Sequence, residues 1–148
     1  NKYSNMKNGS YLLSDKWLHE RLKKYFGDAG GIYELYCMKP KTDILPIDYA
    51  RNYDPMGTLY IGKAESFQKD VIELQTAMEP SNDSSLHECS KAYWGKPEIW
   101  KDYPHRNLYV ELTESKKVDK SFVDKLHGFM EEFEDLPPLN RKNYNGKI

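Results

Sequence analysis

The chain has 148 residues, of which 39% are hydrophobic and 30% charged, and these values are typical of one soluble globular domain with its own core. Its formal net charge of −1 counts against a protein that coats nucleic acid non-specifically, because phosphate binding draws on an excess of Lys and Arg. No apolar run is long enough to span a membrane, and Cys37 and Cys89 lack the spacing of a metal site or a disulfide framework. We therefore expect reduced thiols and a cytoplasmic protein.

The first predicted element is an N-terminal helical extension over residues 11–27, within a single domain of residues 1–148. Residues 1–10 are polar and are expected to be loose. Ser14 is a favourable N-cap for a helix that begins at Asp15, and Gly27 stands where a C-cap is expected. The apolar residues that recur at helical spacing between them are Leu18, Leu22 and Phe26.

Two predicted strands follow, separated by a long connection. Ile32–Met38 is rich in β-branched and aromatic residues, which is typical of a strand. Lys39–Gly57 contains three prolines among charged residues and is interpreted as a long surface excursion. The second strand is predicted at Thr58–Gly62.

The period of the pattern then changes to that of a helix that follows Ser66. Its apolar face consists of Phe67, Val71, Leu74 and Met78. Residues 80–83, Pro-Ser-Asn-Asp, end this helix, and Ser84 is a candidate cap for a short helix that runs towards Trp94.

The last two predicted elements are a strand at Asn107–Glu114, where apolar and polar residues alternate, and a helix at Lys120–Glu134. The apolar face of this helix consists of Phe122, Leu126, Phe129, Met130 and Phe133. The order of elements predicts an α+β fold with a small three-stranded antiparallel sheet flanked by helices. The side chains on the apolar helix faces are expected to be largely buried.

Two tripeptides lie on the first two predicted strands. Gly31-Ile32-Tyr33 opens the first strand and Tyr60-Ile61-Gly62 closes the second. Together with the helix after the second strand and the later strand and helix, this pair resembles the signature of the GIY-YIG nuclease superfamily over residues 30–140. The resemblance implies hydrolysis of DNA phosphodiester bonds with one divalent cation, Mg²⁺ or Mn²⁺.

The resemblance also implies which residues are catalytic. The two tyrosines are Tyr33 and Tyr60, Lys63 follows the second tripeptide, and Asn140 matches an Asn that follows a proline near the end of the family's domain. Attack on a phosphate needs a positioned water, a proton acceptor and positive charge near the developing oxyanions.

Two positions of the family pattern are not matched. Asp70 stands where the family has an Arg, and Asp repels the phosphate that Arg would bind. The register that aligns the last helix places His127 where the family has its metal-binding Glu. His127 is a candidate acid/base or ligand of a softer metal. Glu131 is the candidate carboxylate for the cation, with Glu132 as its alternative, although a solvated helix end is the plainer interpretation of these residues.

Several other residues offer alternative roles. Lys69 or Arg106 could supply the missing positive charge, and Arg141 and Lys142 in the basic tail could follow a nucleic-acid backbone. His87 on the short helix is a further acid/base candidate, although a histidine with satisfied hydrogen bonds is the plainer interpretation.

Two main interpretations of function remain open: a metal-dependent DNA endonuclease, or a degenerate GIY-YIG fold that binds nucleic acid or protein. A third is an unrelated binding module in which the tripeptides occur by chance.

Overall fold

Four antiparallel strands form the sheet that positions the candidate site. The computed structural model of the chain describes residues 6–38, 47–48, 53–54, 56–83 and 86–140. Across the sheet the strands come in the order β1 (Asn8–Leu12), β6 (Leu108–Glu114), β2 (Gly31–Cys37) and β5 (Tyr60–Ala64). The α-helices of the described residues are α1 (Leu18–Phe26), α2 (Phe67–Met78), α3 (Glu88–Trp94), α4 (Pro97–Asp102) and α5 (Val118–Phe133). The predicted α+β class is confirmed, but the predicted sheet of three strands is wrong because a fourth strand joins it.

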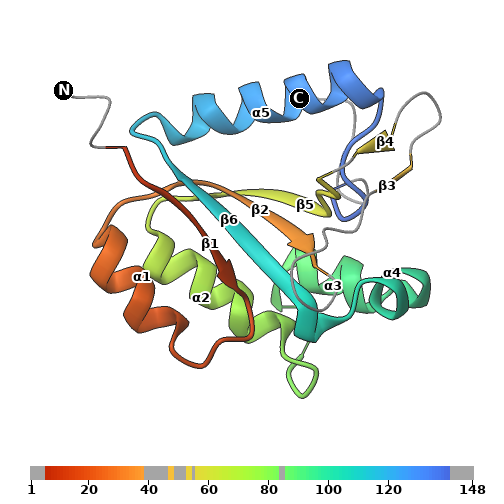
Figure 1. Ribbon diagram of the computed structural model, residues 1–148, viewed down its shortest axis with the longest axis horizontal. Coiled ribbons are helices and arrows are strands. Elements are labelled where there is room, and N and C mark those ends of the chain that lie inside the picture. The colour runs from red at the N-terminus through yellow and green to blue at the C-terminus, as the bar shows by residue number, and fades with distance from the viewer. Residues whose placement is uncertain (1–5, 39–46, 49–52, 55, 84–85, 141–148) are drawn as a thin grey trace.

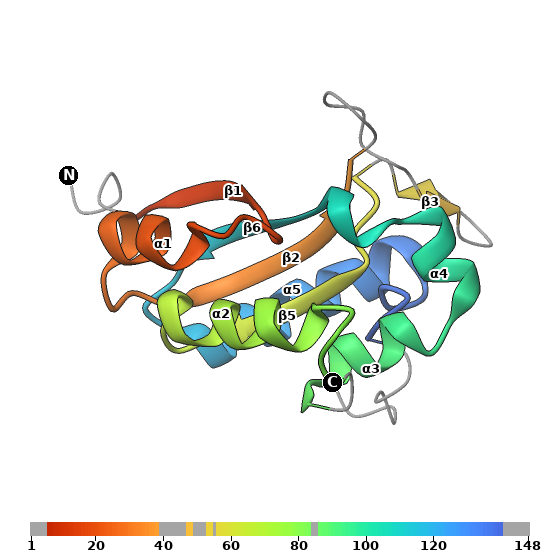
Figure 2. The ribbon, with the colours of Figure 1, turned by 90° about the horizontal axis from the view of Figure 1, so that it is seen from below.

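The helices cover the two faces of the sheet unequally. Figure 1 shows α5 alone across one face, with α1, α2 and α3 on the other. Figure 2, which is seen from below, shows α1 and α2 side by side in front of the strands. The larger core lies on the side of α1 to α3 and includes Leu35 and Phe67, both fully buried. A smaller cluster lies under α5 and consists of Ile32, Ile61, Leu126 and Leu136. None of the helices in the described part of the chain is both long and apolar enough to span a bilayer.

The strand that the sequence analysis missed is β1. It pairs with β6 at the edge of the sheet, from Asn8 opposite Thr113 to Leu12 opposite Tyr109. Its residues, Asn-Gly-Ser-Tyr-Leu, are exposed or half-buried and show no clean alternation of apolar and polar side chains. Backbone hydrogen bonds to β6, rather than side-chain burial, therefore account for this strand, and residues 8–12 are ordered where we expected loose chain.

The first helix also begins later than predicted. α1 follows Trp17 rather than Ser14, because Asp15 forms a turn before it. The Asp15 carboxylate accepts hydrogen bonds from the Trp17 backbone N–H at 2.9 Å and from Arg21 Nε at 2.7 Å. Gly27 follows the helix with φ of 59°, which confirms the predicted end at a position that favours glycine.

The remaining elements agree with the predictions apart from their ends. β2 and β6 lie where predicted, α2 follows Ser66 as expected, and β5 begins two residues later than predicted. α3 begins at Glu88 and α5 at Val118, whereas the sequence indicated Ser84 and Lys120. α4 was not predicted, because its six residues are too few to show a helical period.

Most of the predicted excursion over Lys39–Gly57 lies outside the described residues. Within it, β3 (Ile47–Asp48) pairs antiparallel with β4 (Tyr53–Asp54). The Asp54 side chain is buried and accepts hydrogen bonds from the backbone N–H groups of Met56 and Thr58, at 2.9 and 2.8 Å. This carboxylate thus holds the turn that leads into β5.

The core predictions are confirmed for α2 and only partly for α5. Phe67, Val71 and Leu74 are fully buried. On α5, Leu126 and Phe133 are buried, but Phe129 and Met130, which we expected to be largely buried, are partly exposed. No second helix flanks α5 on its face of the sheet (Figure 1) among the described residues, so the sides of this helix stay open to solvent. Both cysteines are buried and free, as predicted.

Candidate active site

The register of the sheet places the two motif tyrosines on one face. Tyr33 lies opposite Gly62 and Leu35 lies opposite Tyr60, so both tyrosine rings project from the same side of neighbouring strands. Their ring centroids are 6.1 Å apart. Both rings are buried in the core on the side of α1 to α3. This confirms the prediction that Tyr33 and Tyr60 lie on adjacent strands of one antiparallel sheet.

A close backbone approach explains the glycine of the first tripeptide. A Cβ atom on Gly31 would lie 2.0 Å from the carbonyl oxygen of Thr113 on β6. Any larger residue would therefore push β6 away from the start of β2 and disturb the register that aligns Tyr33.

His87 reaches the tyrosines from the start of α3. It is the N-cap of this helix, and its Nδ1 accepts a hydrogen bond from the Cys89 backbone N–H at 3.0 Å. Because Nδ1 is an acceptor, the neutral ring carries its proton on Nε2, which lies 3.5 Å from the Tyr33 hydroxyl. The same imidazole packs edge-on against Tyr60, with ring centroids 6.0 Å apart.

Glu88, the next residue, contacts the second tyrosine. The Tyr60 hydroxyl donates a hydrogen bond to Glu88 Oε1. Glu88 is exposed, whereas Tyr60 is buried, so the carboxylate forms the solvent-facing end of this pair. Tyr33, Tyr60, His87 and Glu88 together are called the tyrosine cluster below.

The electric field at the tyrosine cluster is negative. Burial raises the pKa of Tyr33 well above its usual range, and the charges of Glu88, Asp70 and Glu73 raise it further. Burial is also the main cause of the raised pKa of Tyr60. The pKa of His87 is lowered, because burial outweighs the same three carboxylates. At neutral pH both phenols are therefore protonated and the imidazole is uncharged.

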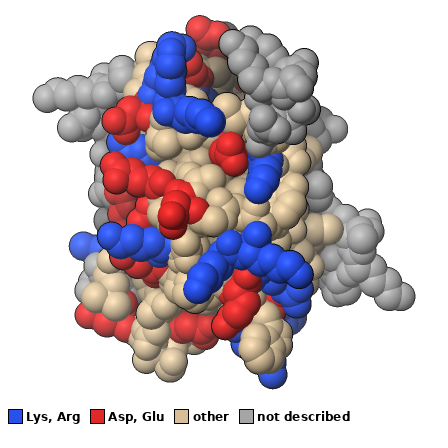
Figure 3. Space-filling model, turned by 90° about the vertical axis from the view of Figure 1, so that its left-hand side faces the viewer, with Lys and Arg blue, Asp and Glu red and all other residues tan. Residues whose placement is uncertain are grey.

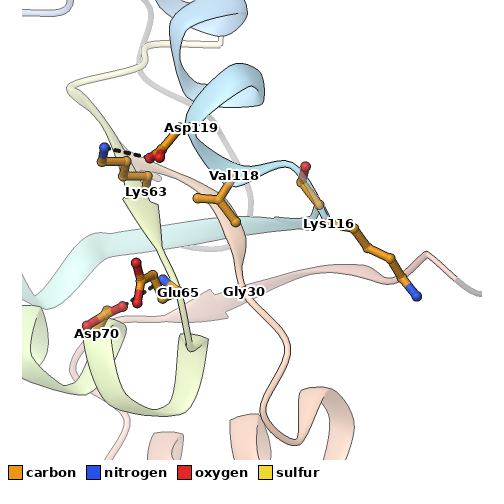
Figure 4. A pocket seen from close by; sticks show the side chains of 8 residues that line it. Gly30, Lys63, Glu65, Asp70, Lys116, Val118 and Asp119 are labelled. Atoms are coloured by element: carbon orange, nitrogen blue, oxygen red, sulfur yellow. Dashed lines mark hydrogen bonds and ion pairs between the residues drawn. The ribbon is translucent and has the colours of Figure 1, made fainter.

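Asp70, which stands where the family has an Arg, has a structural partner. Its carboxylate accepts hydrogen bonds from the backbone N–H groups of Glu65 and Ser66, at 2.8 and 3.3 Å. These donors precede α2, so Asp70 stabilises the N-terminus of that helix. Figure 4 shows the contact between Asp70 and Glu65 at the edge of a neighbouring cavity.

Lys63 lies on the opposite face of the sheet from the tyrosine rings. Its Nζ is 2.8 Å from Asp119 Oδ1 at the start of α5 and 5.5 Å from the centre of the Phe122 ring. It lines a cavity of about 710 Å³, with Glu65, Asp70 and Lys116 among the other lining residues (Figure 4). Figure 3 shows this end of the molecule, where acidic and basic side chains are intermixed. The cavity has no excess of positive charge and is not a phosphate cleft.

The other candidates from the sequence are dispersed. His127 and Glu131 are exposed one turn apart on α5, beyond the sheet from the tyrosine cluster. Lys69 is exposed on α2, and Arg106 lies in the short 3-10 helix η3 (His105–Asn107). Arg141 and Lys142 lie outside the described residues. Their roles in binding DNA or a cation stay predictions, and the structure does not bring His127, Glu131 or Lys63 together with the tyrosines.

Asn140 holds the end of the domain to the edge of the sheet. Its Oδ1 accepts from the Ile61 backbone N–H at 2.9 Å, and its Nδ2 donates to the Ile61 carbonyl at 3.0 Å. The Leu139 N–H adds a bond to the Leu59 carbonyl at 2.9 Å. The side-chain amide thus pairs with the backbone N–H and carbonyl groups at the outer edge of β5, as a neighbouring strand would. Asn140 therefore has a structural role that does not depend on catalysis.

Glu88 is the residue of the tyrosine cluster that sequence reasoning missed. An acidic residue in the first turn of a helix is ordinary, because it interacts favourably with the helix dipole. Nothing in the sequence therefore distinguishes Glu88 from Glu73 or Glu131. Only the fold shows that the start of α3 faces Tyr60.

Glu88 supplies the one carboxylate of the tyrosine cluster. The described residues contain no group of three or more His, Cys, Asp or Glu side chains that could hold a metal ion. Mg²⁺ is commonly bound by one or two carboxylates, with water and substrate phosphate as the remaining ligands. The exposed carboxylate of Glu88 fits such a site.

Comparison with known proteins gives no assignment. The chain matches no family model, no curated protein and no solved structure.

Proposed function

We propose that the chain is a GIY-YIG-type phosphodiesterase that acts on DNA, with the tyrosine cluster as its reacting site. One observation carries this proposal. The hydroxyl groups of Tyr33 and Tyr60, one from each tripeptide, contact two consecutive residues. Tyr33 contacts His87, and Tyr60 contacts Glu88. Two phenols, an imidazole and an exposed carboxylate in one place form a set of proton donors and acceptors suited to hydrolysis.

Each side chain has a distinct role in this proposal. Tyr33 and the protonated Nε2 of His87 are hydrogen-bond donors for a phosphate oxygen. Tyr60 orients the Glu88 carboxylate through their hydrogen bond. Glu88 would hold the divalent cation, Mg²⁺ or Mn²⁺, and the bound cation would supply positive charge for the phosphate and activate water.

The same geometry favours slow hydrolysis. The charged neighbours that shift the pKa of Tyr33 and His87 include three carboxylates, and no Lys or Arg is among them. A site that lacks one preorganised donor typically loses about 10²–10³ in rate. We therefore expect this chain to cleave DNA much more slowly than a nuclease with an Arg in place of Asp70.

A second candidate function follows from the negative field. A degenerate GIY-YIG domain would bind nucleic acid or protein without hydrolysis. The three carboxylates near the tyrosines weaken phosphate chemistry at the tyrosine cluster, so they favour a domain that does not cleave and whose ligand binds elsewhere on the surface. The two candidates share the fold and differ in chemistry.

Nicking of supercoiled plasmid DNA separates the two. The phosphodiesterase predicts slow nicking that requires Mg²⁺ or Mn²⁺, stops in EDTA and decreases in Tyr60→Phe, which removes the hydroxyl that orients Glu88. Binding of the plasmid with no nicking above the EDTA control favours the second candidate.

A further inference from the structure

A second pocket lies at the far end of α3 from the tyrosine cluster. Six residues line this cavity of about 570 Å³: Trp94, Trp100, Lys101, Pro104, His105 and Arg106. They come from the end of α3, from α4 and from the turn that leads through η3 into β6. Figure 2 shows α3 and α4 next to each other on this side of the molecule.

Aromatic rings form much of the wall of this pocket. The Trp94 ring lies 6.2 Å from the Trp100 ring and 6.1 Å from the His105 ring, with interplanar angles of 41° and 39°. A hydrogen bond of 3.1 Å from Trp94 Nε1 to the Met78 carbonyl fixes the first indole. Trp94 and Trp100 are both half-buried, so parts of the two ring systems remain open to a ligand.

The charged side chains that line the pocket are both basic. Lys101 and Arg106 are exposed, and Lys101 Nζ lies 5.6 Å from the centre of the Trp100 ring. Within the described ranges, neither cation forms an ion pair with a carboxylate. This arrangement contrasts with the cavity beside Lys63, where the lysine is paired with Asp119.

A flat aromatic ligand with an attached anion satisfies both features. We propose that this pocket, here called the tryptophan pocket, binds one unpaired nucleotide of a nucleic-acid strand. The base stacks on the exposed part of Trp100, and Lys101 and Arg106 contact the phosphates on either side. A base in a duplex is already stacked on both faces, so the pocket selects single-stranded or flipped-out nucleotides. The ligand class follows from the proposed function, and the pocket itself is separate from the tyrosine cluster.

The position of the pocket suits a strand that also reaches the tyrosine cluster. Trp94 lies six residues after Glu88 on the same helix. At 1.5 Å per residue, the two positions are about 9 Å apart along the helix axis, which is within the reach of one to two nucleotides. α3 thus connects the two sites as a rigid spacer.

Binding of a fluorescently labelled single-stranded oligothymidylate, measured by anisotropy in EDTA, tests this inference. EDTA prevents cleavage, so the result does not depend on catalysis. Trp100→Ala is expected to weaken binding about tenfold or more, since stacking of a single base is worth that much. Arg106→Ala should weaken binding and reduce the slope of log affinity against log salt by about 0.7, the value for one phosphate of a single strand.

The chain contains a matched control for this experiment. Lys16 lies 5.5 Å from the centre of the exposed Trp17 ring, a pair much like Lys101 and Trp100 but with Asp15 and Arg21 as its neighbours. Trp17→Ala and Lys16→Ala should bind the oligonucleotide as the unaltered protein does. Trp100→Phe, which retains an aromatic face, should keep most of the affinity and guards against a folding defect.

Three results would overturn the inference. The first is that the unaltered protein does not bind the oligonucleotide. The second is that Trp17→Ala and Trp100→Ala lose affinity for it equally. The third is that Trp100→Ala loses as much affinity for duplex DNA as for single-stranded DNA. Binding of the oligonucleotide by the unaltered protein, together with no metal-dependent nicking of plasmid, would contradict the phosphodiesterase while supporting the tryptophan pocket.

Discussion

The ring of Tyr33 lies directly against Gly62 on the neighbouring strand. The two residues are cross-strand partners, and a Cβ atom on Gly62 would lie 2.2 Å from Cζ and 2.5 Å from the hydroxyl oxygen of Tyr33. The glycine of the second tripeptide therefore leaves room for the tyrosine of the first. This contact keeps the Tyr33 hydroxyl directed at His87 and links the two motifs physically.

Gly62→Ala should displace the Tyr33 ring and destabilise the domain. Overpacking of a core typically costs about 1–3 kcal/mol, and we expect a loss of free energy of unfolding in that range. Urea denaturation monitored by circular dichroism measures it. Gly128→Ala is the control, because a Cβ there has no neighbour within 4 Å and alanine favours the α5 helix. Equal unfolding midpoints for the two variants would show that Tyr33 does not require the glycine.

Asn140→Ala should destabilise the domain because it removes both hydrogen bonds to Ile61 at the edge of β5. Leaving such groups unpaired costs about 1–3 kcal/mol, which a shift of the urea midpoint would reveal. Asn82→Ala, which removes one exposed hydrogen bond to the Thr76 carbonyl, should have a smaller effect. A normal midpoint in Asn140→Ala combined with lost DNA cleavage would instead assign Asn140 to catalysis.

The sequence correctly predicts the strands whose residues show a strong pattern, and it misses the strand that is held in place by backbone hydrogen bonds. β2 and β6 carry β-branched or alternating residues and were located within one residue. β1 is held at the sheet edge by its ladder to β6, and its half-exposed side chains give no period to detect. The motifs correctly placed Tyr33 and Tyr60 on neighbouring strands. Residues 80–83 were also expected to end α2, but no local pattern specifies that the next helix brings Glu88 to Tyr60.

Stability should decrease as the pH falls through the range in which an exposed histidine titrates. Burial lowers the pKa of His87 below its usual value of 6.5, so the unfolded chain takes up this proton more readily than the folded one. The contribution to stability is complete above about pH 6.5 and is lost at lower pH. His87→Asn, which retains an N-cap acceptor, should lose less stability than the unaltered protein between pH 7 and 5.

A smaller dependence of stability on pH should persist in His87→Asn, because burial also lowers the pKa of His105. Urea midpoints at several pH values provide the measurement. Identical pH dependence in His87→Asn and the unaltered protein would mean that His87 is not held neutral in the folded state.

Glu73→Lys should increase DNA affinity and the rate of nicking. Glu73 is exposed on α2, and its charge contributes to the negative field at Tyr33 and His87. Replacing one nearby surface charge is worth about 1 kcal/mol, so an increase of a few-fold is expected at low salt. Glu132→Lys makes the same charge change on α5 and should have little effect on nicking. An equal increase in both variants would show a response to net charge alone.

The most direct test of the reacting site compares two exposed glutamates on opposite sides of the sheet. Glu88 contacts Tyr60, and Glu131 lies on α5 near the position that the family motif suggests. The test is the rate of plasmid nicking with Mn²⁺ for Glu88→Gln and for Glu131→Gln, each of which removes a single charge. The account predicts a loss of at least about 10²-fold for Glu88→Gln and an unchanged rate for Glu131→Gln. Loss of activity in Glu131→Gln with activity retained in Glu88→Gln, or no nicking by the unaltered protein, would contradict it.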